Sequence, residues 1–211
     1  KSTIYTREKL KEANIPFFGL FINGDITETF LKVGNDEESN PIYFVGCGWK
    51  NEQCRQSDSE NYGCLDFNFK ELINIFDHIK NISIKSRIFL FSHHGYEYEY
   101  WPLPLHVDYS RRLVNYGYEG IFSCHTHTIQ DYEFYKNKPI YYGLGNMFFG
   151  SSLIKHSDNF TKGRIVNISF KRNKLLCRNY LIKTNSRSNI INLKEDQKSE
   201  SCLNKIITMF N

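Results

Sequence analysis

Four of the seven histidines lie in two clusters, and each cluster directly follows an apolar segment: His93, His94, His125 and His127. The apolar segments are 87–91 and 121–123. A neutral imidazole nitrogen is the commonest metal ligand in proteins and suits zinc, manganese or iron. In an extended segment, residues two apart point to the same side, so we expect His125 and His127 to aim at one point while Thr126 points away. The alternative is a set of ordinary core or surface histidines, which the two strand-end positions disfavour.

An aromatic-rich stretch, Tyr96–Trp101, follows the first cluster. Exposed rings there would stack on a sugar or a base, whereas the alternative is a packed loop. Four lysines near the clusters would attract an anionic substrate, although a solvated surface explains them equally well: Lys136, Lys138, Lys155 and Lys162.

Strands that end at the two clusters would hold the histidines in place. The segments 87–91 and 121–123 are continuous apolar runs, which are typical of buried parallel strands. Reactive groups at the carboxyl ends of such strands are a common arrangement in α/β proteins.

Helices are predicted on either side of the segment 87–91. Asn68 with Glu71 has the spacing of a capping box and is followed by apolar residues at helical spacing. A second helix opens at Pro102 and Pro104 and ends at Gly117.

The remaining elements complete an α/β pattern. We predict the end of a helix at 6–13, a buried strand at 15–21, short strands at 41–45, 131–135 and 139–144, and a hairpin of 164–170 with 175–182. Residues 24–40 are polar and turn-rich, 46–64 form a loop, and 184–201 form a polar surface segment. This order indicates an α/β fold with a mixed sheet.

Composition sets broad limits. The chain has 211 residues, a net charge of +4 and 16% aromatic residues, which suffice for a sizeable core. The charge does not support nucleic-acid binding, and no apolar run is long enough to span a membrane. Of the six cysteines, Cys47, Cys54 and Cys64 lie close enough in sequence for a disulfide, but the loose spacing favours thiols.

Three sequence blocks resemble the CapA family of capsule and poly-γ-glutamate synthesis proteins, a branch of the calcineurin-like metallophosphatases. Residues 93–102 (HHGYEYEYWP) resemble its H-W-G-x-E-Y-x-x-x-P block, with His94 in place of Trp. Residues 123–130 (SCHTHTIQ) resemble G-x-H-P-H-V-x-Q, with Ser123 and Thr126 in place of Gly and Pro. Residues 138–147 (KPIYYGLGNM) resemble K-P-I-x-Y-S-L-G-N-F.

The resemblance implies a site and a cofactor. His93, His125 and His127 would ligate divalent metal ions (Mn, Fe or Zn, two in the complete domain). Glu97 and His94 would be catalytic groups or substrate contacts at the mouth of the site. Gln130, Asn146 and Tyr98 would orient ligands or bind substrate.

The family also has a Gly-Asp and an Asn-Asn-His block, and the latter has no counterpart here. Asn23-Gly24-Asp25 follows the first helix, where the family has no ligand, and we interpret it as a turn. The sequence begins with Lys1 and not with methionine. We therefore expect residues 1–183 to be the C-terminal two-thirds of a metallophosphatase-type mixed β-sandwich flanked by helices. Its N-terminal part would be missing, and residues 184–211 would form a polar segment and tail.

The resemblance predicts a metal-dependent hydrolase of a phosphoester or γ-glutamyl amide bond that acts in capsule or cell-surface polymer biosynthesis. Its partners would be an anionic polymer, phosphoester or poly-γ-glutamate-like substrate and a capsule synthesis complex, with no nucleic acid. The family implies a place at the membrane or cell envelope, reached through a preceding N-terminal segment. The alternative is a non-catalytic polymer-binding or scaffold component of a capsule synthesis complex.

Overall fold

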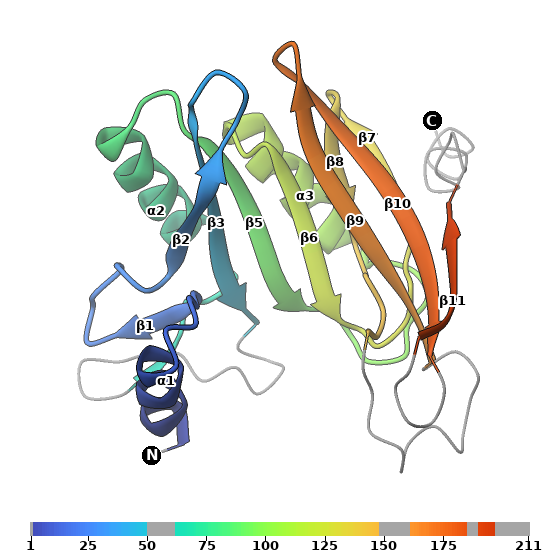
Figure 1. Ribbon diagram of the computed structural model, residues 1–211, viewed down its shortest axis with the longest axis horizontal. Helices are drawn as coiled ribbons and strands as arrows, with labels where there is room; N and C mark the ends of the chain where they lie inside the picture. Colours follow the sequence, from blue (N-terminus) through green and yellow to red (C-terminus); the bar gives the residue numbers. More distant parts are fainter. Residues whose placement is uncertain (1, 50–61, 148–160, 185–189, 197–211) are drawn as a thin grey trace.

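A computed structural model of the chain describes residues 2–49, 62–147, 161–184 and 190–196. These residues form three helices and eleven strands (Figure 1). The helices are α1 (Ser2–Glu12), α2 (Phe69–Ile82) and α3 (Pro104–Tyr116). The strands are β1 (Leu20–Ile22), β2 (Phe30–Asn35), β3 (Pro41–Gly48), β4 (Tyr62–Cys64), β5 (Arg87–His94), β6 (Gly120–His125), β7 (Tyr132–Tyr135), β8 (Lys138–Tyr141), β9 (Lys162–Lys171), β10 (Lys174–Thr184) and β11 (Ile190–Glu195).

A six-stranded mixed sheet forms the centre of the molecule, in the order β2-β3-β5-β6-β8-β7. The inner strands β3, β5, β6 and β8 are parallel, and β2 and β7 are antiparallel edge strands. The segments that lead into β5 and β6 contain α2 and α3, which is the crossover that parallel neighbours require. The carboxyl ends of β5 and β6 therefore lie side by side, with His94 paired in register with His125.

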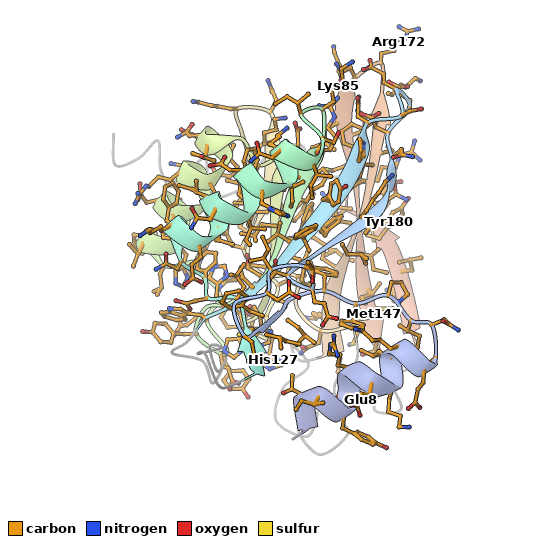
Figure 2. All side chains as sticks on the ribbon, turned by 90° about the vertical axis from the view of Figure 1, so that its left-hand side faces the viewer. Glu8, Lys85, His127, Met147, Arg172 and Tyr180 are labelled. Atoms are coloured by element: carbon orange, nitrogen blue, oxygen red, sulfur yellow. The ribbon has the colours of Figure 1, made fainter. Side chains whose placement is uncertain are left out.

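The central sheet is covered on both faces (Figure 2). On one face, α2 and α3 bury Leu72, Ile79 and Leu113 against Ile88 and Leu90. On the other face, the hairpin of β9 and β10 covers an aromatic cluster that includes Phe89, Phe122 and Tyr141. Two buried faces explain why the consecutive residues Ile88, Phe89 and Leu90 are all apolar instead of alternating with polar ones. The α/β class with a mixed sheet is thus confirmed.

Both helices that flank β5 begin as their sequences predict, and α3 also ends at the predicted residue. The Asn68 side chain accepts hydrogen bonds from the backbone N–H groups of Lys70 and Glu71. Pro104 opens α3, and Gly117 ends it with φ +143°. The apolar face of α2 is buried at Leu72, Ile75, Phe76 and Ile79.

Several predicted boundaries were wrong. Of the expected buried strand 15–21, only residues 20 and 21 lie in a strand, β1. This strand is partly exposed because it pairs with β4 outside the central sheet. Residues 30–35, expected to be polar loop, form the edge strand β2, since an edge tolerates polar residues such as Asn35. In the expected loop 46–64, residues 46–48 belong to β3 and residues 62–64 form β4.

The polar segment expected from residue 184 onward contains β11, which pairs with β10. Arg164 is buried and forms an ion pair with Asp196 directly after β11. The exposed residues Asn192, Lys194 and Glu195 give this edge strand its polar appearance in the sequence.

No disulfide joins any two of the four cysteines in the described ranges, Cys47, Cys64, Cys124 and Cys177. Cys54 and Cys202 lie outside these ranges. Asn23-Gly24-Asp25 is a turn, as predicted, with positive φ at Asn23 and Gly24 and a hydrogen bond from the Asp25 N–H to the Ile22 carbonyl. Among the helices that the structure describes, none has the length and apolar character needed to cross a bilayer.

Candidate functional site

His93 and His125 meet at the carboxyl ends of the adjacent strands β5 and β6. The Nε2 atom of His93 and the Nδ1 atom of His125 are 2.9 Å apart, within hydrogen-bond distance. The Sγ atom of Cys124 lies 3.4 Å from Nδ1 of His93. Parallel pairing in register brings these three residues together, because Cys124 is the partner of His93 across the two strands.

The chain leaves β6 through an unusual backbone conformation. His125 has φ +104° and His127 has φ +57°, so 125–127 is not the extended segment that we expected. Positive φ values at non-glycine residues cost about 1–3 kcal/mol each and are found where surrounding contacts enforce them. Thr126 does point away from the histidines, and its buried hydroxyl donates to the Thr128 carbonyl at 3.1 Å.

His127 is held by Asn146, which comes from the segment after β8. The Asn146 amide donates to the His127 carbonyl at 3.2 Å, and its Oδ1 atom lies 2.8 Å from Nδ1 of His127. Since the amide oxygen can only accept, Nδ1 of His127 carries a proton and the Nε2 atom is directed away from Asn146. That Nε2 atom is 4.0 Å from the Glu97 carboxylate.

Glu97 and Tyr98 lie on the same side of the molecule as His127. The Tyr98 ring stacks on the His127 ring with centroids 6.1 Å apart. Burial and the neighbouring Glu97 carboxylate raise the pKa of Tyr98. Figure 2 shows His127 at the end of the sheet opposite Lys85 and Arg172.

Gln130 fixes the loop that carries Glu97 and Tyr98. Its side chain is buried, and its Nε2 atom donates to the Glu99 carbonyl at 3.0 Å. Gln130 therefore supports the loop and does not reach the imidazoles directly.

His94 lies apart from the other three histidines. Its side chain is only 2% exposed, stacks on Phe67 with ring centroids 4.0 Å apart and lies 3.0 Å from the Ser92 hydroxyl. Burial, together with the nearby His106, lowers the pKa of His94 well below 6.5, so the ring is neutral at pH 7. Because neighbouring residues of a strand point to opposite faces, His93 faces the site and His94 faces the core beneath α3. We therefore assign His94 a packing role in place of the predicted substrate contact.

The lysines expected around the site are mostly elsewhere. Lys138 forms an ion pair with Glu119, which precedes β6 at the opposite end of the sheet. Lys136 lies over the Tyr135 ring in the turn before β8. Lys162 is near, since its carbonyl accepts from the Asn146 N–H at 2.9 Å, while Lys155 lies outside the described residues.

Two neighbours of the histidines escaped the sequence interpretation. Cys124 contacts His93, and Trp49 donates its backbone N–H to the His93 carbonyl at 2.9 Å. Cys124 lies inside the second sequence block, and the strand register would have pointed to it. Trp49 has no such signal, because it follows β3, far away in the sequence.

Imidazole nitrogens suit a divalent transition-metal ion, and the geometry of the first two histidines is compatible with one. Ligand nitrogens with bonds of about 2.1 Å lie about 3.0 Å apart at the right angles of an octahedral ion and about 3.4 Å apart around tetrahedral zinc. The 2.9 Å between the ring nitrogens of His93 and His125 is close to the first value. Within the described ranges, no group of three or more His, Cys, Asp or Glu side chains is arranged to hold one ion. His93 and His125 could supply part of a metal site, and the His127 ring lies beside them, with its centroid 6.2 Å from that of His125.

Comparison with models of known protein families gives a match. The family model described as bacterial capsule synthesis protein PGA_cap matches residues 1–151, which include all the histidines discussed above. This match confirms the resemblance inferred from the three sequence blocks. A search of curated proteins finds no match.

Proposed function

This chain belongs to the family of bacterial capsule synthesis proteins, and from that premise we propose that it is a metal-dependent hydrolase in capsule or cell-surface polymer synthesis. The bond cleaved would be a phosphoester or a γ-glutamyl amide. A calcineurin-like metallophosphatase fold is part of the proposal, supported by the mixed central sheet between two helices and a second sheet.

The observation that carries the proposal is the close approach of His93 and His125 at the carboxyl ends of parallel strands. These two imidazoles would share one divalent ion (Mn, Fe or Zn). His127, with its Nε2 atom directed away from Asn146, would serve a second ion. Ligands beyond these three histidines would complete both positions.

A bound divalent ion supplies Lewis-acid polarisation of the scissile group and lowers the pKa of a water molecule. The chain's own residues would do the rest. Asn146 fixes the ring and the tautomer of His127, as hydrogen-bonded neighbours of metal ligands commonly do. The exposed carboxylate of Glu97 is placed to hold or accept a proton next to His127.

Metal analysis of single variants tests the ligand assignment. We expect the full-length protein, dialysed after exposure to Mn²⁺, to retain metal, and His93→Ala and His125→Ala to lose most of it. His78→Ala is the matched control, because this histidine lies on α2 against Phe30. Circular dichroism confirms that each variant is folded. Equal metal content in all four proteins would refute the assignment.

Hydrolysis is measured on the same proteins with bis-p-nitrophenyl phosphate and γ-glutamyl-p-nitroanilide. Turnover of either substrate that requires added metal, and that falls in the two site variants alone, supports the hydrolase. Metal binding without any turnover would favour the non-catalytic polymer-binding alternative.

A further inference from the structure

The loop between β5 and α3 exposes an unusual set of rings close to the histidines. Four aromatic side chains of this loop are 44–53% exposed: Tyr96, Tyr98, Tyr100 and Trp101. We call residues 96–101 the aromatic loop. Single exposed apolar residues are ordinary on a surface, but a contiguous group of large rings marks an interaction site.

The exposure is not the result of a loose chain, because the aromatic loop is bonded to the segment after β6. The Tyr98 N–H donates to the Thr126 carbonyl at 2.8 Å. The Glu99 carbonyl accepts from both the Thr128 hydroxyl and the Gln130 amide. Tyr98 itself is held at φ +69°. Such a strained, pinned loop presents its rings in a fixed arrangement, which reduces the entropy lost on binding.

The aromatic loop also continues directly into the histidine cluster. Tyr98 stacks on His127, and the Glu97 carboxylate lies 4.0 Å from the same imidazole. A ligand lying across the rings would therefore extend to the histidines.

The charge of this region selects among polymers. Residues 88–110 contain no lysine or arginine, while Glu97 and Glu99 alternate with the exposed tyrosines and Asp108 follows in α3. A polyanion such as poly-γ-glutamate would be repelled by these carboxylates. Sugar rings suit the same surface, because their C–H faces pack on aromatic rings and their hydroxyls donate to carboxylates.

We propose that the aromatic loop is a binding platform for a neutral polysaccharide strand, which it positions beside His127. A neutral polysaccharide has neither the phosphoester nor the γ-glutamyl amide bond that the proposed hydrolase would cleave, so the platform would hold a glycan next to the site, and this proposal goes beyond the proposed function. The binding itself is independent of any metal or turnover.

An array that carries neutral hexose and N-acetylhexosamine oligosaccharides beside immobilised poly-γ-glutamate tests the proposal with the full-length protein. We expect binding to one or more neutral glycans that depends on the aromatic loop, and no poly-γ-glutamate binding that depends on this loop. Tyr100→Ala and Trp101→Ala should each weaken the glycan binding about tenfold, the equivalent of one lost stacking contact. Phe134→Ala, which removes a 46% exposed ring from β7, is the control and should bind as the unaltered protein does.

Binding repeated after EDTA treatment, and with His93→Ala, separates the two proposals. Glycan binding that persists in both cases supports the platform even if metal binding or hydrolysis fails. Absence of binding to every neutral glycan, poly-γ-glutamate binding that is lost in the loop variants, or equal glycan binding by the loop variants and the control would overturn the platform.

Discussion

Replacement of Gly95 by alanine perturbs the junction between β5 and the aromatic loop. Gly95 has φ +112°, a conformation that L residues rarely adopt. A Cβ atom at this position would lie 2.7 Å from the Cγ2 atom of Thr126, at the start of the segment that carries His127. Gly95→Ala therefore strains the backbone and pushes the two loops of the candidate site apart.

The two effects have separate magnitudes. The backbone strain costs about 1–3 kcal/mol. The steric overlap must be relieved by movement of a buried threonine, which costs about 1–3 kcal/mol. We expect the free energy of unfolding to fall by roughly 3 kcal/mol in all.

Urea unfolding with two further variants distinguishes these costs. Gly24 also has positive φ, at +79°, but a Cβ atom at this position would have no neighbour within 4 Å, so Gly24→Ala should show the backbone cost alone. Thr126→Ser removes Cγ2 but keeps the hydroxyl that donates to Thr128. Gly95→Ala combined with Thr126→Ser should therefore recover the steric part.

Two outcomes would refute this reasoning. One is a Gly95→Ala protein as stable as the unaltered chain. The other is a Thr126→Ser change whose effect is the same with glycine or alanine at position 95, which would show that the two sites are not coupled.

Three further predictions concern buried ionisable side chains and can be checked by denaturant unfolding. Arg111→Met should cost about 3 kcal/mol, because it leaves Glu133, 2% exposed and held by two hydrogen bonds from Arg111, without its counter-charge; an unchanged midpoint would contradict this. Burial opposes ionisation of Asp36, but hydrogen bonds led by those from Asn40 lower its pKa from 3.8 to about 2. Ionised Asp36 therefore contributes about 2 kcal/mol to the free energy of unfolding above pH 3.8, and this contribution is lost as pH falls towards 2. Asp36→Asn should be less stable at neutral pH, and its free energy of unfolding should fall less steeply as the pH is lowered. His94 is buried in its neutral form with a lowered pKa, so the free energy of unfolding should fall as the pH drops below 6.5, by up to about 1.4 kcal/mol per pH unit. The His94→Phe variant should lose this pH dependence. An unchanged dependence in the variant would exclude His94 as the titrating group.

The elements that hold the histidines could be predicted because their signals are local. The apolar runs before His93 and His125, the cap at Asn68 and the stop at Gly117 each act within a few residues. The edge strands β2 and β11 could not be predicted, because no described side chain in either strand is fully buried and their sequences therefore carry no buried-strand pattern. The edge strand β7 could be predicted, because its first two residues are buried.

The arrangement of the candidate site could likewise be predicted only in part. The grouping of His93 with His125 follows from two strands that both end in histidine, and the sequence contains that information. Asn146 was predicted to orient a ligand only through the family resemblance, and its partner, His127, emerged only from the fold.

By itself, the sequence determined the family, the α/β class and the residue types at the strand ends, since these depend on composition, short-range spacing and motif order. The tertiary structure decided which histidine faces the site. His93 and His94 are neighbours of the same type, yet strand pleating turns one towards His125 and the other into the core. It also decided that the aromatic loop is exposed and fixed, because the hydrogen bonds that hold it come from residues about thirty positions away. Register between strands and positive backbone angles are properties of the assembled fold, and no local sequence pattern encodes them.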